Sequence, residues 1–570
     1  MNVPICQILP KSQTNRSFCQ IMILIWTAVL TAAASAAAAE EDRTALIDHL
    51  RNWNGNVQPT KIVSWNAYSR QFIDAPTFKL LPMPKVTKYT AEVKQGQQSW
   101  QVKSDTPFLS LETIWPQMEN KIFTLNFQWL DQAGTSLAAE NSIRVKAPDW
   151  QGLQEPDADW RGAADRNMEY FIHTAWHGKA PYREPDMPVW IWSCASPTVT
   201  HDYWTGDFPD GYPMSYPCNT HALFIGGLLI YADHGRPQSE EAMRLARITA
   251  DWNLKNRLPD SGAVPLFPYS TITNGQFGGG NEGAHITLLR ASLLAIAYVD
   301  IYRATQHQPY LDYAIHIAKT TAKFQREDGS FPYRIDPQTG AVSEQYTPAA
   351  ADFAALVYAL EPYYYDPDLT MAAQRAIYWT IAQVCTSSYW KGVYEDVFPW
   401  PPFSNLSGGE TQLFIRLLCQ LKEQDPAFVP LARQLNRFVE DQFVIFSSES
   451  EAFIHPVKGL LHVKGPLVFE QFVCWYPMEA HAGLWIRTLI ELHKATGEPV
   501  YLEKARAAAN AICALQFEDG QFSTLGMRYY QDGKIISDKE TGFNWYNCNV
   551  AASMWLYTLD AYVKSLSEKN

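Results

Sequence analysis

The chain has 570 residues, of which 47% are hydrophobic and 18% charged, a composition of globular rather than disordered proteins. Its formal net charge of −13 and pI near 5.5 argue against a nucleic-acid partner, which calls for a basic face. The aromatic content is high, with 20 Trp, 29 Tyr and 27 Phe. Because aromatic faces stack on sugar rings, this content fits a carbohydrate-binding protein, and it fits an aromatic-packed core equally well.

The N-terminus carries the pattern of a secretory signal. Lys11 and Arg16 precede the apolar run 21–26, and small residues follow at 32–39. A positive flank, a short apolar stretch and a small-residue cleavage region predict a signal peptide over residues 1–39. No later stretch is long and apolar enough to span a bilayer. We therefore expect an exported protein, periplasmic or secreted, with no membrane partner after signal cleavage.

Residues 40–57 are predicted to be a linker, and residues 58–150 a small β domain. The runs 88–94 and 123–130 alternate polar and apolar residues, which is the period of a half-buried strand. Turn-forming residues separate these runs. Short strands at this spacing predict a small antiparallel β-sandwich of fibronectin-type or immunoglobulin-like size. Nothing in this domain points to chemistry.

The remainder of the chain repeats one unit, in which a loop rich in Asp, Gly and aromatic residues follows an amphipathic helix and precedes a more apolar one. Corresponding loop positions lie 68 residues apart: Asp260, Asp328 and Asp396, and again Glu451 and Asp519. A repeated unit of this kind must bury its apolar face against its neighbours. Six such pairs can close into a ring. We therefore expect a mainly α protein, an (α/α)6 toroid over residues 160–566.

The two sets of helices differ in their patterns. Outer, amphipathic helices are predicted near 163–177, 239–257, 308–325, 368–385, 428–443 and 499–515. Inner helices are predicted near 219–233, 283–304, 347–360, 410–422, 478–495 and 549–565. Apolar residues nearly encircle the second set, as in 293–299, and a helix that is apolar on all sides is buried.

The segments that precede the inner helices are rich in Asn, His, Glu, Tyr and Trp. Ring closure brings these six segments to one end of the toroid, so we expect the functional site there. Candidate catalytic residues are Asn219, His221, Glu282, His285, Arg334 and Tyr346. Candidate substrate-binding residues are Trp204, Tyr333, Glu410, Trp475, Tyr476, His481, Trp545 and Tyr546. Taken singly, Asn219 and Asn549 also suit helix N-caps, and Glu410 suits the positive end of a helix dipole.

Helix-pair repeats with loops such as Asp328-Gly329-Ser330-Phe331 and Asp519-Gly520-Gln521-Phe522, joined to a β module, resemble the six-hairpin (α/α)-toroid carbohydrate-active enzymes. That superfamily includes glycoside hydrolases, unsaturated-glucuronyl hydrolases, many polysaccharide lyases and, in part, uronyl C5-epimerases. The resemblance implies an enzyme that acts on a polysaccharide or oligosaccharide. It does not fix the reaction, because one fold hosts many chemistries.

In the favoured hypothesis the protein is a lyase that cleaves a uronic-acid polysaccharide by β-elimination. The resemblance implies that Asn, His or Arg neutralises the sugar carboxylate and that Tyr or His acts as base and acid. Here Asn219, His221, His285, Arg334 and Tyr346 are of these types. A Tyr base needs a lowered pKa, which Arg334 can supply.

A second hypothesis is a glycoside hydrolase, which needs two carboxyl groups across the scissile bond. Glu282, Glu410, Glu479 and Asp207 are the candidates, and no sequence feature sets two of them apart. A pair of aspartates at adjacent inner-helix starts, as the resemblance to unsaturated-glucuronyl hydrolases implies, is not evident.

A third hypothesis is a glycan-binding protein without activity, whose stacking platforms are Trp204, Trp475 and Trp545. No close metal-binding spacing such as H-E-x-x-H occurs, so no metal or cofactor is expected. A structural calcium ion stays open, as does the oligomeric state.

Overall fold

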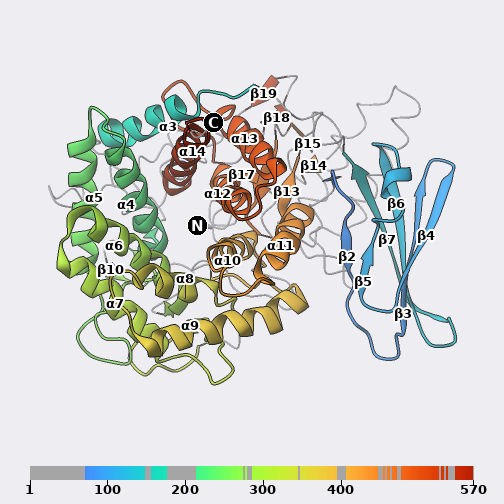
Figure 1. Cartoon of the computed structure of the whole chain (residues 1–570), viewed down its shortest axis with the longest axis horizontal. Coiled ribbons are helices and arrows are strands. Elements are labelled where there is room, and N and C mark those ends of the chain that lie inside the picture. Colours follow the sequence, from blue (N-terminus) through green and yellow to red (C-terminus); the bar gives the residue numbers. More distant parts are fainter. Residues whose placement is uncertain are drawn as a thin grey trace, which may run out of the picture.

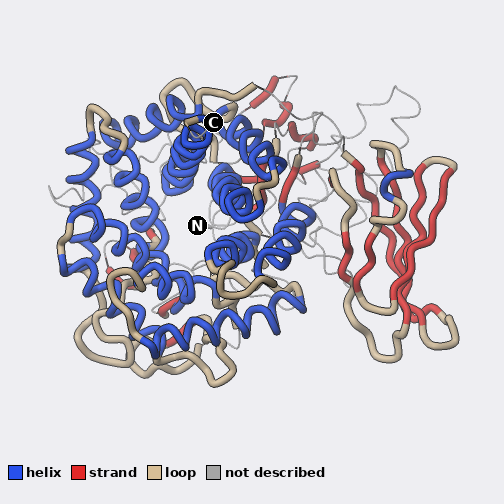
Figure 2. Tube along the Cα trace, viewed as in Figure 1, coloured by secondary structure: helices blue, strands red, loops and turns tan. Residues whose placement is uncertain are grey.

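The computed structural model describes residues 71–147, 156–175, 214–273, 276–278, 285–343, 347–393, 406–446, 454–455, 459–462, 465–471, 477–524, 528–531, 534–536 and 546–568. The predicted signal peptide and linker lie outside these residues. The described part is a ring of helices with a strand-rich module beside it (Figures 1 and 2). No helix of the described part is both long and apolar enough to cross a membrane.

Six inner helices form a closed ring. Each contacts the next in chain order, and the last contacts the first (Figure 1). They are α4 (Pro217–Asp233), α6 (Ala291–Thr305), α8 (Ala351–Leu360), α10 (Gly408–Gln420), α12 (Glu479–Thr496) and α14 (Tyr546–Ser567). Five of these helices lie close to their predicted ranges, whereas α6 begins at Ala291 rather than near 283, because β11 (Ile286–Thr287) and a short 3-10 turn precede it.

Six outer helices cover the ring. They are α3 (Trp160–Glu169), α5 (Ser239–Lys255), α7 (Gln308–Ala322), α9 (Pro367–Trp379), α11 (Phe428–Phe443) and α13 (Pro499–Cys513). Short π-helical turns continue α3 through Ala175 and α9 through Cys385. Each outer helix after α3 packs on the inner helix that precedes it, while α3 packs on α14. One face of each is buried, as at Ala432, Leu435, Asn436 and Val439 of α11, which explains the amphipathic pattern.

A network of buried amides closes the ring between its first and last helices. Asn167 of α3 donates to Asn549 Oδ1 of α14 (3.1 Å) and accepts from Ser553 (2.8 Å). The Asn549 side chain also pairs with both backbone groups of Phe522, at 2.6 and 3.0 Å. Asn549 is therefore an interior residue of α14 that joins chain ends, and it is not the N-cap that its sequence position suggests.

The Asp-Gly loops of two units have the same backbone conformation and make the same contact. Gly329 and Gly520 both have φ +94°, and an added Cβ on either would meet a carbonyl of the neighbouring outer helix at 2.5 Å. Gln325 donates across the gap to Ala372 O (2.8 Å), and Gln516 donates to Ala163 O (2.7 Å). The repeated loop in sequence is thus a repeated contact between adjacent units.

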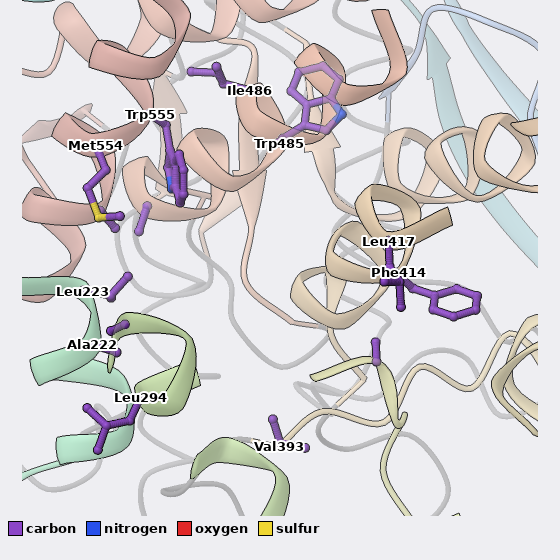
Figure 3. Packing of buried hydrophobic residues seen from close by; sticks show 14 of the residues in the cluster. Ala222, Leu223, Leu294, Val393, Phe414, Leu417, Trp485, Ile486, Met554 and Trp555 are labelled. Atoms are coloured by element: carbon purple, nitrogen blue, oxygen red, sulfur yellow. The ribbon is translucent and has the colours of Figure 1, made fainter. Parts of the chain in front are cut away.

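One hydrophobic core extends around the whole ring. Figure 3 shows part of it, with side chains that converge from α4, α6, α10, α12 and α14. The labelled residues include Leu223, Leu294, Phe414, Trp485 and Trp555, and all are buried. A continuous core of this kind makes the ring one packed body and fixes the relative positions of the inner helices.

The strand-rich module has its own core, which includes Phe78, Leu109, Phe127 and Trp129. Its five-stranded sheet has the order β1-β7-β6-β3-β4, with β1 (Gln71–Phe72), β3 (Lys88–Gln95), β4 (Gln98–Ser104), β6 (Ile122–Leu130) and β7 (Ser136–Lys146). All pairings in it are antiparallel except β1 with β7. The second layer of the expected sandwich consists, among the described residues, of the pair β2 (Thr77–Lys79) and β5 (Phe108–Ser110).

The module contacts the ring through ion pairs of the exposed Asp74 with charged residues of α11 and α13. Arg437 of α11 forms an ion pair with Asp74 and donates to Ala75 O (3.0 Å). Lys504 of α13 donates to both oxygens of Glu440 at 2.8 Å and lies 3.7 Å from Asp74. Desolvation raises the pKa of Asp74, but the charges of Arg437 and Lys504 outweigh it and lower that pKa overall. The module is therefore fixed against the ring rather than tethered to it.

Short strand pairs line the ring near the starts of the inner helices. The strands are β8 (Met214–Ser215), β9 (Ile272–Thr273), β10 (Gln276–Phe277), β11 (Ile286–Thr287), β12 (Arg334–Ile335), β13 (Val444–Ile445), β16 (Leu467–Phe469) and β17 (Pro477–Met478). A further sheet is formed by β14 (Ile454–His455), β15 (Gly459–His462), β18 (Arg528–Gln531) and β19 (Lys534–Ile536).

Candidate active site

The first turns of the six inner helices meet at one end of the ring, which we call the mouth. They meet there because each inner helix is followed by an outer helix that returns the chain to its starting end. Buried polar residues occur in or directly before each of these helix starts. They are Asn219 and Thr220 (α4), Arg290 before α6 and Ser292 in it, Asp352 (α8), Glu410 and Gln412 (α10), Glu479 and His481 (α12), and Asn547 and Asn549 (α14).

Every inner helix contributes a buried polar atom at the mouth that has no hydrogen-bond partner within the described residues. These atoms are Asn219 Nδ2, Ser292 Oγ, Asp352 Oδ2, Glu410 Oε2, His481 Nδ1 and both amide atoms of Gln412 and of Asn547. Buried polar groups are nearly always paired, because an unpaired one costs about 1–3 kcal/mol. Their presence in all six inner helices at one end of the ring makes the mouth the candidate functional site.

Asp352 and Glu410 form a pair of carboxyl groups at the mouth. They lie in the first turns of α8 and α10, which contact each other, and both are buried. Burial, followed by the charge of Glu410, raises the pKa of Asp352 from 3.8 to about 7, while Arg290 and Arg416 oppose the rise. One carboxyl group therefore keeps a proton near neutral pH beside another that carries a charge.

The neighbours of Glu410 hold one of its oxygens and leave the other open. Oε1 accepts a hydrogen bond from Val393 N (3.2 Å), and Oε2 has no partner within the described residues. The turn that carries Glu410 is capped by Ser407, whose Oγ accepts from Gly409 N (3.0 Å). Glu410 was a predicted substrate-binding residue and hydrolase candidate, and Asp352 was not predicted.

Asp352 had a recognisable sequence feature. It is the one charged residue in the run 349–360 before Leu360 ends α8, and its neighbours Ala351 and Phe353 are apolar. A charge placed in the first turn of a fully buried helix costs free energy unless it has a function or a partner. The predicted bounds of this inner helix were therefore enough to identify Asp352 as its unusual residue.

His221 lies between the inner and outer layers and does not face the centre of the ring. Its Nδ1 lies 2.9 Å from Asn253 Nδ2 and 3.1 Å from Asn253 Oδ1, and its ring meets Trp252 edge-on at 5.2 Å. Burial lowers its pKa to about 4, against a smaller opposing effect of the Asn253 hydrogen bond. The imidazole is thus neutral at physiological pH and links α4 to α5, a position that favours a structural role. Asn219, two residues earlier, lies at the mouth inside α4 rather than at its N-cap.

The strand pair β11–β12 joins the segment of His285 to that of Tyr333 and Arg334, which were predicted from separate units, and His285 lies at the Asp336 end of the pair, away from Tyr333. Thr287 pairs with Arg334 and Ile286 with Ile335. The guanidinium of Arg334 lies 4.6 Å from the centre of the Tyr333 ring, and both side chains are buried. His285 is half-buried, and its Nδ1 has no partner within the described residues.

His481 and Glu470 form a second titratable pair at the mouth. His481 Nε2 lies 3.5 Å from Glu470 Oε1, and both side chains are buried. The neighbouring Glu479 accepts a hydrogen bond from Asn549 Nδ2 (3.1 Å), which ties it to the amide network that closes the ring. His481, a predicted substrate-binding residue, therefore lies at the mouth. Glu479 helps to hold the ring of inner helices closed.

Tyr546 packs among aromatic rings at the start of α14. Its ring meets Phe171 at 4.9 Å and Tyr170 at 6.3 Å, both edge-on, and it is buried. This position favours core packing over substrate contact. The remaining predicted site residues, Trp204, Asp207, Glu282, Tyr346, Trp475, Tyr476 and Trp545, lie outside the described residues. Within the described part, no group of three or more His, Cys, Asp or Glu residues is arranged to hold a metal ion.

Comparisons with known proteins give structural likeness only. No family model and no curated protein sequence matches the chain. A family 76 glycoside hydrolase from a bovine Bacteroides thetaiotaomicron strain is 11% identical over 87% of this chain and 98% of its own, with a TM-score of 0.45. A D-mannose isomerase is 11% identical over 72% and 97%, with a TM-score of 0.48. A polysaccharide lyase is 13% identical over 88% and 65%, with a TM-score of 0.42.

These neighbours differ in the reaction that their names give, and no single family is resolved among them. Their identities and TM-scores assign no reaction, substrate or residue role to this chain. The chemistry must be argued from the mouth itself.

Proposed function

We propose that the protein is an exported glycoside hydrolase that cleaves a polysaccharide or oligosaccharide at the mouth of its ring. The observation that carries this proposal is the Asp352–Glu410 pair, with its raised Asp352 pKa. The proposal adopts the second of the hypotheses drawn from the sequence, and it replaces the undefined set of glutamates with one named pair.

Glycoside hydrolysis needs one carboxyl group that is protonated near neutral pH and one that is ionised. Asp352, with a pKa of about 7, is suited to protonate the leaving glycosidic oxygen. Glu410 is the second carboxyl group, and its open Oε2 is suited to act on the anomeric carbon or on an attacking water. The charge of Glu410 also keeps the proton on Asp352, so each carboxyl group prepares the other for its role.

The unpaired amides of the mouth suit a sugar substrate. A sugar hydroxyl both donates and accepts hydrogen bonds, and a Gln or Asn side chain offers both kinds of group. Gln412 and Asn547 each have an unpaired donor and acceptor within the described residues, and Asn219 has an unpaired donor. We assign these residues to substrate binding together with His481. Trp204, Trp475, Tyr476 and Trp545 stay predicted stacking platforms.

A second candidate function is β-elimination at the β11–β12 pair. It is supported by the contact of Arg334 with the Tyr333 ring, since a cationic side chain beside a tyrosine suits the neutralisation of a uronic carboxylate. Tyr346 and Glu282 complete this hypothesis as predictions. His221 contributes less to it, because its low pKa makes it a weak base.

One experiment separates the two chemistries. The mature protein is incubated with polygalacturonate, alginate, xylan and mannan, and both reducing ends and absorbance near 235 nm are followed. Hydrolysis releases reducing ends without absorbance, whereas elimination creates a conjugated double bond that absorbs. The proposal expects reducing ends alone, and their loss in the Asp352→Asn, Glu410→Gln double variant. A rise at 235 nm selects the lyase, and retained binding without either product selects the non-catalytic hypothesis.

The proposal extends to the organisation of the chain. Residues 1–39 are assigned to a signal peptide, 40–57 to a linker, 58–150 to a fibronectin-type or immunoglobulin-like β-sandwich and 160–566 to the catalytic toroid. The mature enzyme is placed in the periplasm or outside the cell. Neither a metal nor another cofactor takes part in the proposed reaction.

A further inference from the structure

Large exposed hydrophobic side chains are concentrated in one segment of the described chain. Seven such residues occur among the described residues, and four of them lie between 363 and 378. Tyr365 is 65% exposed, Tyr378 60%, Met371 50% and Tyr363 39%. Isolated exposed apolar residues need no explanation, but a cluster marks an interaction site.

Met371 and Tyr378 lie on α9, an outer helix of the ring (Figure 1), and Tyr363 and Tyr365 lie in the turn that precedes it. Met371, Gln374, Tyr378 and Ala382 recur at helical spacing on one face and all are exposed. The opposite face, with Ala372, Ala373, Ala376 and Ile377, is buried in the ring. The exposed residues are thus not needed for the core, and their stripe has little charge.

The corresponding faces of other outer helices are charged. In α5, for example, Glu241 and Arg244 form an exposed ion pair (2.6 Å). The solvent face of α9 carries Arg375 as its charged residue in the middle turns, and Arg375 donates to Gln325 (2.7 Å) in the contact between units. The uncharged aromatic stripe is therefore a property of α9 that ring packing does not require.

Polar side chains border the aromatic stripe. A small cavity of about 30 Å³ lies beside Tyr378 and is lined by Tyr358, Gln374, Gln424 and Asp425. Two amides, a carboxylate and a phenol hydroxyl there provide both donors and acceptors. The volume suits a single hydroxyl group or a water molecule rather than a whole ligand. The remaining ligand would lie along the exposed tyrosines.

We propose that this α9 patch, defined by Tyr365, Met371, Gln374, Tyr378 and Gln424, is a second carbohydrate-binding site that holds a segment of the polysaccharide outside the mouth. The proposal rests on the proposed function in that it takes the substrate to be a polymer of sugars. From Met371 to Tyr378 the helix rises about 10 Å, which spans roughly two sugar rings. Tyrosine faces bordered by amides and a carboxylate suit sugar rings, which offer an apolar ring face and equatorial hydroxyls.

The test uses binding and activity separately. Wild-type protein and Tyr378→Ala are run in native gels that contain polygalacturonate, alginate, xylan or mannan. The wild type should be retarded in at least one gel, and Tyr378→Ala should need about three- to tenfold more polysaccharide for equal retardation. Phe108→Ala, which removes an exposed aromatic side chain of the β module, is the control and should behave as wild type. No retardation of the wild type, or equal retardation of all three proteins, contradicts the site.

Two further measurements keep this proposal distinct from the proposed function. Turnover of a soluble disaccharide fragment of the retarding polysaccharide should be equal in Tyr378→Ala and wild type, while turnover of the polymer at low concentration should fall in the variant. Retardation of the Asp352→Asn, Glu410→Gln variant that weakens when Tyr378→Ala is added to it supports the patch even where hydrolysis fails. A wild-type dimer in light scattering that Tyr378→Ala converts to a monomer assigns the patch to self-association instead, and overturns the proposal.

Discussion

Replacement of Asp352 by Asn should stabilise the protein at alkaline pH, and this prediction needs no knowledge of the substrate. In the folded state the pKa of Asp352 is about 7, because burial and the charge of Glu410 raise it from 3.8. A carboxyl group with a raised folded-state pKa favours folding less and less as pH rises from the unfolded to the folded pKa. The cost is absent below about pH 4, grows between pH 4 and 7, and is constant above.

The difference between 3.8 and about 7 corresponds to about 4 kcal/mol once both states are ionised. The Asp352→Asn variant escapes this cost, because its side-chain amide carries no charge at any of these pH values. Its melting temperature should match that of the wild type near pH 4 and exceed it by several degrees at pH 8. The amide replaces a carboxyl group of the same shape, so packing contributes little to the difference.

Thermal unfolding at pH 4, 6 and 8, followed by circular dichroism at one scan rate, measures this effect. Asp366→Asn is the matched control. Asp366 caps α9, and hydrogen bonds from Tyr364 and the α9 backbone outweigh its desolvation and lower its pKa, so its replacement should not stabilise the protein at pH 8. An Asp352→Asn variant that is no more stable than wild type at pH 8 would refute the raised pKa, and with it the acid role of Asp352.

Three further predictions concern the ring. Gly329→Ala should cost about 2 kcal/mol or more, because φ is +94° and a Cβ would meet the Arg375 carbonyl at 2.5 Å; chemical denaturation measures the loss, and an unchanged midpoint would contradict the described contact. His221→Asn should remove a pH dependence of stability. Folding favours the neutral form of His221, so the free energy of unfolding of the wild type should fall by up to about 3 kcal/mol as pH drops from 6.5 towards 4. The variant should lack this fall. Lys504→Met should cost about 3–5 kcal/mol by leaving Glu440 buried without its closest cation, and equal stability of variant and wild type would show that the charge cluster beside the β module is not tightly buried.

Periodicity predicted the ring because it reports directly on burial. The inner helix α8 appears in the sequence as a nearly continuous apolar run, and the outer helix α11 as an amphipathic one, so their positions followed from the pattern. The recurrence of the Asp-Gly loop at Asp328 and Asp519 likewise reflects one contact that a unit makes with its neighbour. Both features depend on residues that lie close together in the chain, so the sequence alone is enough to predict them.

The site was harder to predict because side-chain direction depends on the layer that a residue faces. His221 and Asn219 are two residues apart on α4, yet one contacts the outer helix α5 and the other lies at the mouth. Asp352 was not predicted because it lies within an apolar run. The same apolar surroundings raise the free energy of its charged form. The proximity of Asp352 to Glu410 comes from the pairing of α8 with α10, and no local sequence pattern reports it.

The measurement that tests the central claim most directly is the rate of reducing-end release by Asp352→Asn and Glu410→Gln, each compared with wild type on the polysaccharide that the wild type cleaves. Asp368→Asn, a carboxyl replacement in the first turn of the outer helix α9, serves as the control. If the two carboxyl groups carry hydrolysis, each mouth variant should lose about 10²–10⁴-fold in rate while its circular dichroism stays that of the wild type, and the control should keep full activity. Activity within a few-fold of wild type in both mouth variants would contradict the assignment of the active site to this pair.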